Sequence, residues 1–133
     1  MIWDIRNDLQ ELSKLSEGLA AFCKEAHIPP TAVADMTLAL EEVVTNIISY
    51  GYPDGREHRI RVRLERKDNA IVITTEDDGV AFDPLAVPSP DLDAPLCERK
   101  IGGLGIHLVR QLMDTLVYHR EHGKNVLVMT KVL

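Results

Sequence analysis

Apolar residues recur at helical spacing in two segments near the start of the chain. Between residues 7 and 26, leucines follow one another at three- and four-residue steps, which predicts an amphipathic helix over 7–26. A second helix is predicted over 31–49, with Thr31 as its N-cap and the turn-rich stretch 51–55 after it. Residues 1–6 leave little room for a strand before the first helix. The buried stripe expected for the second helix is Val33, Met36, Leu40, Val43, Val44 and Ile47.

Strand patterns dominate the rest of the chain. Residues 58–66 alternate apolar and charged side chains, and residues 70–76 follow after a short turn, which predicts a hairpin. Residues 116–120 and 126–132 predict a second hairpin, and the glycine-led segment 104–113 predicts a helix before it. The order of elements favours a single domain over 1–133. We expect a two-layer α+β sandwich, with helices over one face of a mixed, mostly antiparallel sheet.

The stretch between the two hairpins has no regular pattern. Residues 83–101 contain four prolines, at positions 84, 88, 90 and 95, which rule out a continuous helix or a central strand. Long irregular segments are uncommon in compact domains, and many serve as lids over functional sites. We therefore predict a lid over 83–101.

Composition and charge exclude several classes of function. The net charge of −6 argues against broad nucleic-acid binding, and the arginine row on the first strand, Arg59, Arg61 and Arg63, is interpreted as the solvated side of the sheet. We expect no membrane association, because no apolar run has the length of a span and no signal peptide pattern opens the chain. Cys23 is predicted to be core, and together with Cys97 it forms no metal-binding spacing. These features favour a cytoplasmic protein.

Glu42 and Asn46 stand four residues apart in the second predicted helix, so their side chains project from adjacent turns of one face. A carboxylate there is suited to taking a proton from an attacking hydroxyl, and an amide oxygen is a hard ligand for Mg²⁺. The alternative is a solvated helix face, which the neighbouring Glu41 would fit. The apolar residues around Asn46 favour the functional interpretation.

Two further segments contain glycines at positions where a nucleotide could bind. Asp77 and Gly79 end a predicted strand, where a carboxylate can accept a hydrogen bond from an exocyclic amine and glycine permits close approach to a planar ring. The glycine-rich turn 102–105 precedes a helix, whose first backbone N–H groups suit phosphate. Each motif alone has a plain alternative, an acidic turn or an ordinary glycine turn. The turn is neither a P-loop nor a dinucleotide-binding fingerprint.

Taken together, the segments 40–46, 77–84 and 102–114 resemble the motifs of the GHKL ATPase superfamily, and most closely those of the bacterial anti-sigma-factor serine kinases. The resemblance extends over residues 9–133. It implies a Bergerat fold that binds ATP and Mg²⁺, with Glu42 as general base, Asn46 as the Mg²⁺ ligand, Asp77 on the adenine amine and Gly79 beside the ring. It also implies cofactor contacts from Gly103, Leu104, Gly105 and Ile106.

The same resemblance implies a function. It is that of a serine/threonine protein kinase in an anti-sigma or partner-switching circuit, which phosphorylates a STAS-domain anti-anti-sigma partner and sequesters a second protein such as a sigma factor. A nucleotide-gated binding module without kinase activity is the alternative, and Glu42 favours the enzyme because a binder needs no base. The oligomeric state stays open, with a homodimer among the options.

Overall fold

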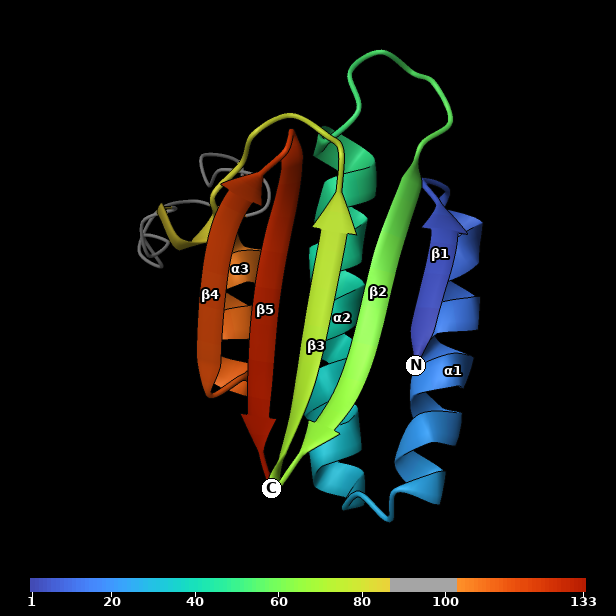
Figure 1. Cartoon of the computed structure of the whole chain (residues 1–133), viewed down its shortest axis with the longest axis vertical. Helices are drawn as coiled ribbons and strands as arrows, with labels where there is room; N and C mark the ends of the chain where they lie inside the picture. The colour runs from blue at the N-terminus through green and yellow to red at the C-terminus, as the bar shows by residue number, and fades with distance from the viewer. Residues whose placement is uncertain (87–102) are drawn as a thin grey trace.

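The described residues form five strands in one sheet, and their helices cover a single face of it (Figure 1). The computed structural model describes residues 1–86 and 103–133. The strand order across the sheet is β1-β2-β3-β5-β4. The elements are β1 (Ile2–Arg6), α1 (Leu12–Glu25), α2 (Pro30–Tyr50), β2 (Arg59–Lys67), β3 (Ala70–Asp77), α3 (Gly103–Leu112), β4 (Thr115–Glu121) and β5 (Lys124–Val132), with 3-10 turns at Leu9–Glu11 and Pro84–Ala86.

The expected two-layer α+β sandwich is confirmed, but the expectation of a mixed sheet is wrong. All four pairings between the described strands are antiparallel. The chain path explains this. Strands β2–β3 and β4–β5 are joined by hairpins, whereas β1 and β2 are separated by two helices and β3 and β5 by α3 and β4. In each of these two connections, the first intervening element runs down the length of the sheet and the second runs back. The chain therefore returns to the end of the sheet that it left, and the next paired strand runs in the opposite direction.

The N-terminal segment departs from the sequence prediction. Residues Ile2–Arg6 do form a strand, which pairs with β2 from Ile2 opposite Arg63 to Arg6 opposite Arg59. The first helix therefore starts later than residue 7, at Leu12, after a 3-10 turn whose start is capped by Asp8. Five alternating residues are too short for a local pattern to reveal, and the partner strand that stabilises them is distant in the sequence. The predicted N-cap at Thr31 is also wrong, because α2 begins one residue earlier at Pro30, a favoured first helical residue.

The core lies between the helices and the inner face of the sheet. On β2, Ile60, Val62 and Leu64 are fully buried while the arginines between them are exposed, which confirms the predicted alternation. Each such side chain contributes roughly 1.5–3 kcal/mol when removed from water. Cys23 is a buried free thiol within this core, as predicted. Cys97 and most of the predicted lid lie outside the described residues.

One end of the sheet gathers the segments that carry the sequence motifs. The C-terminal end of α2, the end of β3 and the β4–β5 hairpin all lie at the same end of the molecule in Figure 1. This arrangement places residues near 46, 77 and 125 beside one another. None of the helices formed by the described residues has the length and apolar character that a bilayer crossing requires.

Candidate nucleotide-binding site

Helix α2 supplies a carboxylate and an amide from adjacent turns, as the spacing predicts. Glu41, the residue beside the carboxylate, points elsewhere and accepts a hydrogen bond of 2.8 Å from Ser16 of α1. Asn46 is only partly exposed, and its Nδ2 atom is buried with no hydrogen-bond partner among the described residues. An unpartnered buried amide costs free energy, so a solvated helix face does not explain this residue.

Helix α3 packs its first turn against this pair. A Cβ atom built on Gly105 would lie 2.6 Å from Glu42 Oε2 and 3.7 Å from Asn46 Nδ2. A larger residue at position 105 would therefore displace the Glu42 carboxylate. The glycine thus brings the N-terminal end of α3, with its backbone N–H groups, to the carboxylate and the amide of α2.

Asp77 ends β3 as a buried carboxylate with a defined orientation. It is 5% exposed, and its Oδ1 atom accepts hydrogen bonds from the Gly79 backbone N–H at 2.9 Å and from Asn125 Nδ2 at 3.0 Å. Burial raises the pKa of Asp77, and these two hydrogen bonds act in the opposite direction. Both bonds end on Oδ1, so Oδ2 is left to accept a hydrogen bond from a ligand.

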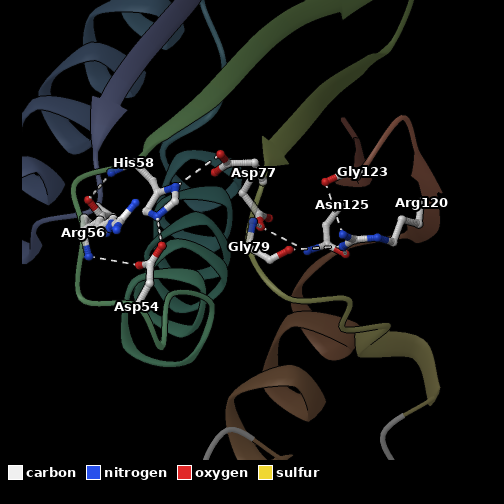
Figure 2. A network of polar contacts seen from close by, with 10 residues as sticks. Asp54, Arg56, His58, Asp77, Gly79, Arg120, Gly123 and Asn125 are labelled. Atoms are coloured by element: carbon white, nitrogen blue, oxygen red, sulfur yellow. Dashed lines mark hydrogen bonds and ion pairs between the residues drawn. The ribbon is translucent and has the colours of Figure 1, made fainter.

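Asn125 joins the acidic turn to the β4–β5 hairpin, and sequence reasoning missed it (Figure 2). Besides Asp77, its Nδ2 group donates to the Val80 carbonyl at 2.8 Å. Its Oδ1 atom accepts from Tyr118 Oη at 2.6 Å and from Arg120 Nη1 at 3.0 Å. In the sequence, the residue has the character of an ordinary turn residue in a hairpin. Its role becomes visible only from the pairing of Asp77 with Asn125 across β3 and β5.

Gly79 is required by the protein itself. A Cβ atom there would lie 2.7 Å from the Gly51 carbonyl oxygen and 2.9 Å from Asp77 Oδ1. The Gly51 carbonyl also accepts a hydrogen bond from the Val80 backbone N–H at 2.9 Å. The glycine therefore allows the segment after β3 to pack against the end of α2, and its expected place beside the adenine ring stays a prediction.

Two hollows adjoin at this end of the sheet. The first, of about 180 Å³, has a mainly apolar lining with a few polar groups, the character expected of a small-molecule site. The second, of about 360 Å³, is lined by Glu42, Gly105, His107, Leu108 and Gln111. The first hollow is lined by Val43, Asn46, Ile47, Tyr50, Gly51, Thr75, Asp77, Val80, Ala81, Phe82, Pro84, Ile106, Tyr118, Asn125 and Leu127.

The structure thus brings most of the predicted site residues together. Asn46, Asp77 and Ile106 line one hollow, and Glu42 and Gly105 line its neighbour. Gly103 and Leu104 begin α3, but Gly102 lies outside the described residues. No cluster of three histidine, cysteine, aspartate or glutamate residues in the described part of the chain could hold a metal. Asn46 fits Mg²⁺, an ion that takes most of its ligands from water and phosphate.

A family comparison agrees with this geometry. The family model described as the histidine kinase-like ATPase domain matches residues 5–131. The chain belongs to the histidine kinase-like ATPase family. Membership confirms the resemblance inferred from the motifs and implies the use of ATP.

This family member is similar to several named proteins. Serine/threonine-protein kinase BtrW of Bordetella bronchiseptica is 33% identical, over 71% of this chain and 67% of that protein. Anti-sigma F factor of Clostridium novyi is 29% identical, with 87% and 82% covered. Serine-protein kinase RsbW of Listeria monocytogenes is 26% identical, with 92% and 78% covered. The kinase names support the expectation of a protein kinase.

The fold has a solved counterpart. The histidine kinase domain of the blue-light-activated histidine kinase from Erythrobacter litoralis EL346 superposes with a TM-score of 0.58 at 16% sequence identity. The match covers 94% of this chain and 60% of that one, so the chain spans three-fifths of the neighbour's length. At this identity the likeness confirms the histidine-kinase-like fold alone.

Proposed function

We propose that this protein is an ATP- and Mg²⁺-dependent serine/threonine protein kinase that acts as a partner-switching regulator. The observation that carries the proposal is the buried Nδ2 atom of Asn46, which lies near Gly105 and has no hydrogen-bond partner among the described residues. A polar group left without a partner at the junction of two hollows is a site that a ligand completes. Family membership supports ATP as that ligand.

Each residue then has a stated task. Asp77 receives the adenine amine on Oδ2, since Oδ1 is already bonded to Gly79 and Asn125. Asn46 offers its amide oxygen to Mg²⁺, and the first turn of α3, including Gly103, Leu104, Gly105 and Ile106, lies against the phosphates. Bound Mg²⁺ neutralises charge on the triphosphate.

Glu42 is the group that distinguishes a kinase from a binder. Its carboxylate lines the hollow beside Gly105, where an acceptor side chain can enter. There it would take the proton of the acceptor serine or threonine hydroxyl as that oxygen bonds to the γ-phosphorus and the bond from that phosphorus to ADP breaks, with ADP as the leaving group. A module that only binds nucleotide has no use for a carboxylate at this position.

The protein partner is a STAS-domain protein of the anti-anti-sigma type, and the second, sequestered partner is a sigma factor or another regulator. The names of the relatives, anti-sigma F factor and serine-protein kinase, support this pairing of activities. Both kinds of partner and the absence of a membrane-spanning helix among the described residues are consistent with action in the cytoplasm.

The test is phosphate transfer from γ-labelled ATP to a recombinant STAS-domain protein from the same organism, with and without Mg²⁺. We expect label on a serine or threonine of the partner only when Mg²⁺ is present. Tight nucleotide binding with no transfer to any STAS-domain protein would favour the nucleotide-gated module instead. Pull-downs in ADP and in ATP then identify the sequestered protein.

A further inference from the structure

His58 lies between two aspartates from different segments (Figure 2). Its Nε2 atom is 2.8 Å from Asp54 Oδ2, in the segment that follows α2, and its Nδ1 atom is 3.2 Å from Asp78 Oδ2, just after β3. The ring also stacks on Tyr52, with centroids 4.3 Å apart and an interplanar angle of 15°. The function proposed above uses none of these side chains.

The geometry requires a protonated ring. A neutral imidazole has one N–H and one lone pair, so it can donate to only one of two carboxylates. With a carboxylate oxygen at each nitrogen, the neutral ring would place a lone pair against Asp54 or Asp78. Only the imidazolium donates to both, so the three-residue arrangement depends on the charge of His58.

This cluster ties together two walls of the cavity that contains Asp77. Gly51 and Val80 both line that cavity, and their backbone hydrogen bond of 2.9 Å joins the end of α2 to the segment after β3. His58 forms the second tie between the same two segments through Asp54 and Asp78. Its own backbone is held by Asn7, which accepts from the His58 N–H at 2.8 Å.

We propose that His58 is a positioning residue of the nucleotide site. Its imidazolium clamps Asp54 to Asp78 and so holds the cavity wall formed by Gly51 and Val80 in place for the adenine base. The inference rests on the proposal that the cavity binds ATP. It predicts that nucleotide affinity varies with pH, although none of the three clamp residues lines the cavity.

The surrounding charges determine the direction of the pH effect. The two carboxylates raise the pKa of His58, with Asp54 the larger influence. The Arg56 backbone N–H, and then His58, lower the pKa of Asp54, while burial raises the pKa of the stacked Tyr52. Because the folded-state pKa of His58 is raised, the clamp is complete below its ordinary value of 6.5 and is lost as pH rises through the raised value.

The experiment measures the Kd of ADP for the full chain between about pH 5.5 and pH 8.5, inside which an unperturbed histidine titrates, by calorimetry. The variants are His58→Gln, which removes the clamp, and His119→Gln, which removes an exposed histidine paired with Glu121 on β4. Ionisation of ADP changes the Kd of every protein equally. The ratio of variant to wild-type Kd therefore reports only the pH dependence that comes from the protein. Exposed ion pairs are weak, so we expect His58→Gln to bind about two- to fivefold more weakly at low pH and equally at high pH. His119→Gln should match wild type throughout.

A ratio for His58→Gln that is constant with pH would overturn the proposal, even if ADP binds tightly. Absence of ADP binding to wild type at any pH would instead reject the proposed function. A second measurement guards against misfolding of the variant: NMR titration of His58 without nucleotide in wild type and in Asp78→Asn. We expect a titration midpoint above the ordinary value in wild type and a lower midpoint in Asp78→Asn; equal midpoints would also overturn the clamp.

Discussion

The two halves of the candidate site are built differently. Around Asp77, the side chains of Asn125, Tyr118 and Arg120 form a hydrogen-bonded network across three strands that holds Oδ1 of Asp77 in place. The Oη atom of Tyr52, near Asp77 and Asp78, is buried without a hydrogen-bond partner among the described residues. Around Asn46, the helices bring a carboxylate, an amide and a glycine together, and the amide nitrogen has no partner among the described residues. The protein itself fixes the carboxylate of the first half, whereas no described residue bonds the buried amide nitrogen of the second.

The difference indicates how the two halves recognise a nucleotide. A rigid, hydrogen-bonded carboxylate presents one free oxygen at a fixed place, which suits a planar base with an invariant edge. The phosphate half contains the Nδ2 donor of Asn46, which no described residue accepts from, so its cost is recovered when a ligand oxygen such as a phosphate oxygen accepts from it. Changes in the first half should therefore affect both folding and binding, and changes in the second should affect ligand binding or chemistry while sparing the fold.

The largest effect is expected from Glu42→Gln. The amide cannot accept the acceptor's proton, so phosphate transfer should fall by about 10²- to 10⁴-fold, the range typical of a lost general base. Nucleotide affinity and melting temperature should stay near wild type, as measured by calorimetry and thermal unfolding. Glu41→Gln is the matched control, because Glu41 bonds Ser16 on α1, and it should keep full transfer activity. Equal loss in both variants would contradict the assigned role.

Asp77→Asn should weaken ATP binding by roughly 30- to 100-fold. The substitution keeps the shape of the side chain but puts an NH₂ group in place of one carboxylate oxygen. When that group faces the adenine amine, two donors meet, and the lost hydrogen bond costs about 2–3 kcal/mol. Titration with ATP and with GTP measures the effect. We expect the ratio of the Kd for GTP to the Kd for ATP to fall in the variant. An unchanged ratio would argue against recognition of the adenine base by Asp77.

Asn125→Ala tests the supporting network. Removing its amide takes away one of the two hydrogen bonds to Asp77 and the bonds to Tyr118 and the Val80 carbonyl, so the free energy of unfolding should fall by about 1–3 kcal/mol. Chemical denaturation is the measurement. Asn69→Ala removes an amide bonded to the Leu133 carbonyl at an exposed position, and it should cost clearly less. A loss no greater than that of the control would show that the network is not stabilising.

The smallest change in stability is expected from Asn46→Leu. The apolar side chain has a similar volume and removes a buried group for which the described residues offer no partner, so the free energy of unfolding should stay within about 1 kcal/mol of wild type and can increase. The comparison with Asn125→Ala is direct, since both substitutions remove one asparagine amide. A loss of stability as large as that of Asn125→Ala would mean that the two halves are not different.

Local patterns predicted most of the fold. The alternation of β2 and the leucine spacing of α1 each report contact with the core, so their positions follow from the sequence. The strand β1 and the all-antiparallel sheet do not follow in this way. Both depend on which strands pair, for example Ile2 with Arg63, and such contacts between distant residues leave no local periodicity.

The same distinction applies to the site. The placement of Glu42 beside Asn46 was predictable because helical spacing alone brings them together, and that of Asp77 because it ends a strand before a glycine. Asn125 and His58 were not, because their roles arise from register across the sheet and from loops that meet at one end. The contact of Gly79 with the Gly51 carbonyl was not predictable either, and the expectation that Gly79 lies beside the ring stays a prediction.

The most direct test compares the binding of adenosine and of Mg²⁺-ATP to wild type and to Asn46→Leu by calorimetry. If the protein itself fixes the base half and a ligand completes the phosphate half, adenosine affinity should be unchanged in the variant, while Mg²⁺-ATP should bind at least tenfold more weakly, the loss of about one charge-assisted contact. Equal affinities of both proteins for Mg²⁺-ATP, or an equal loss for adenosine, would contradict the account.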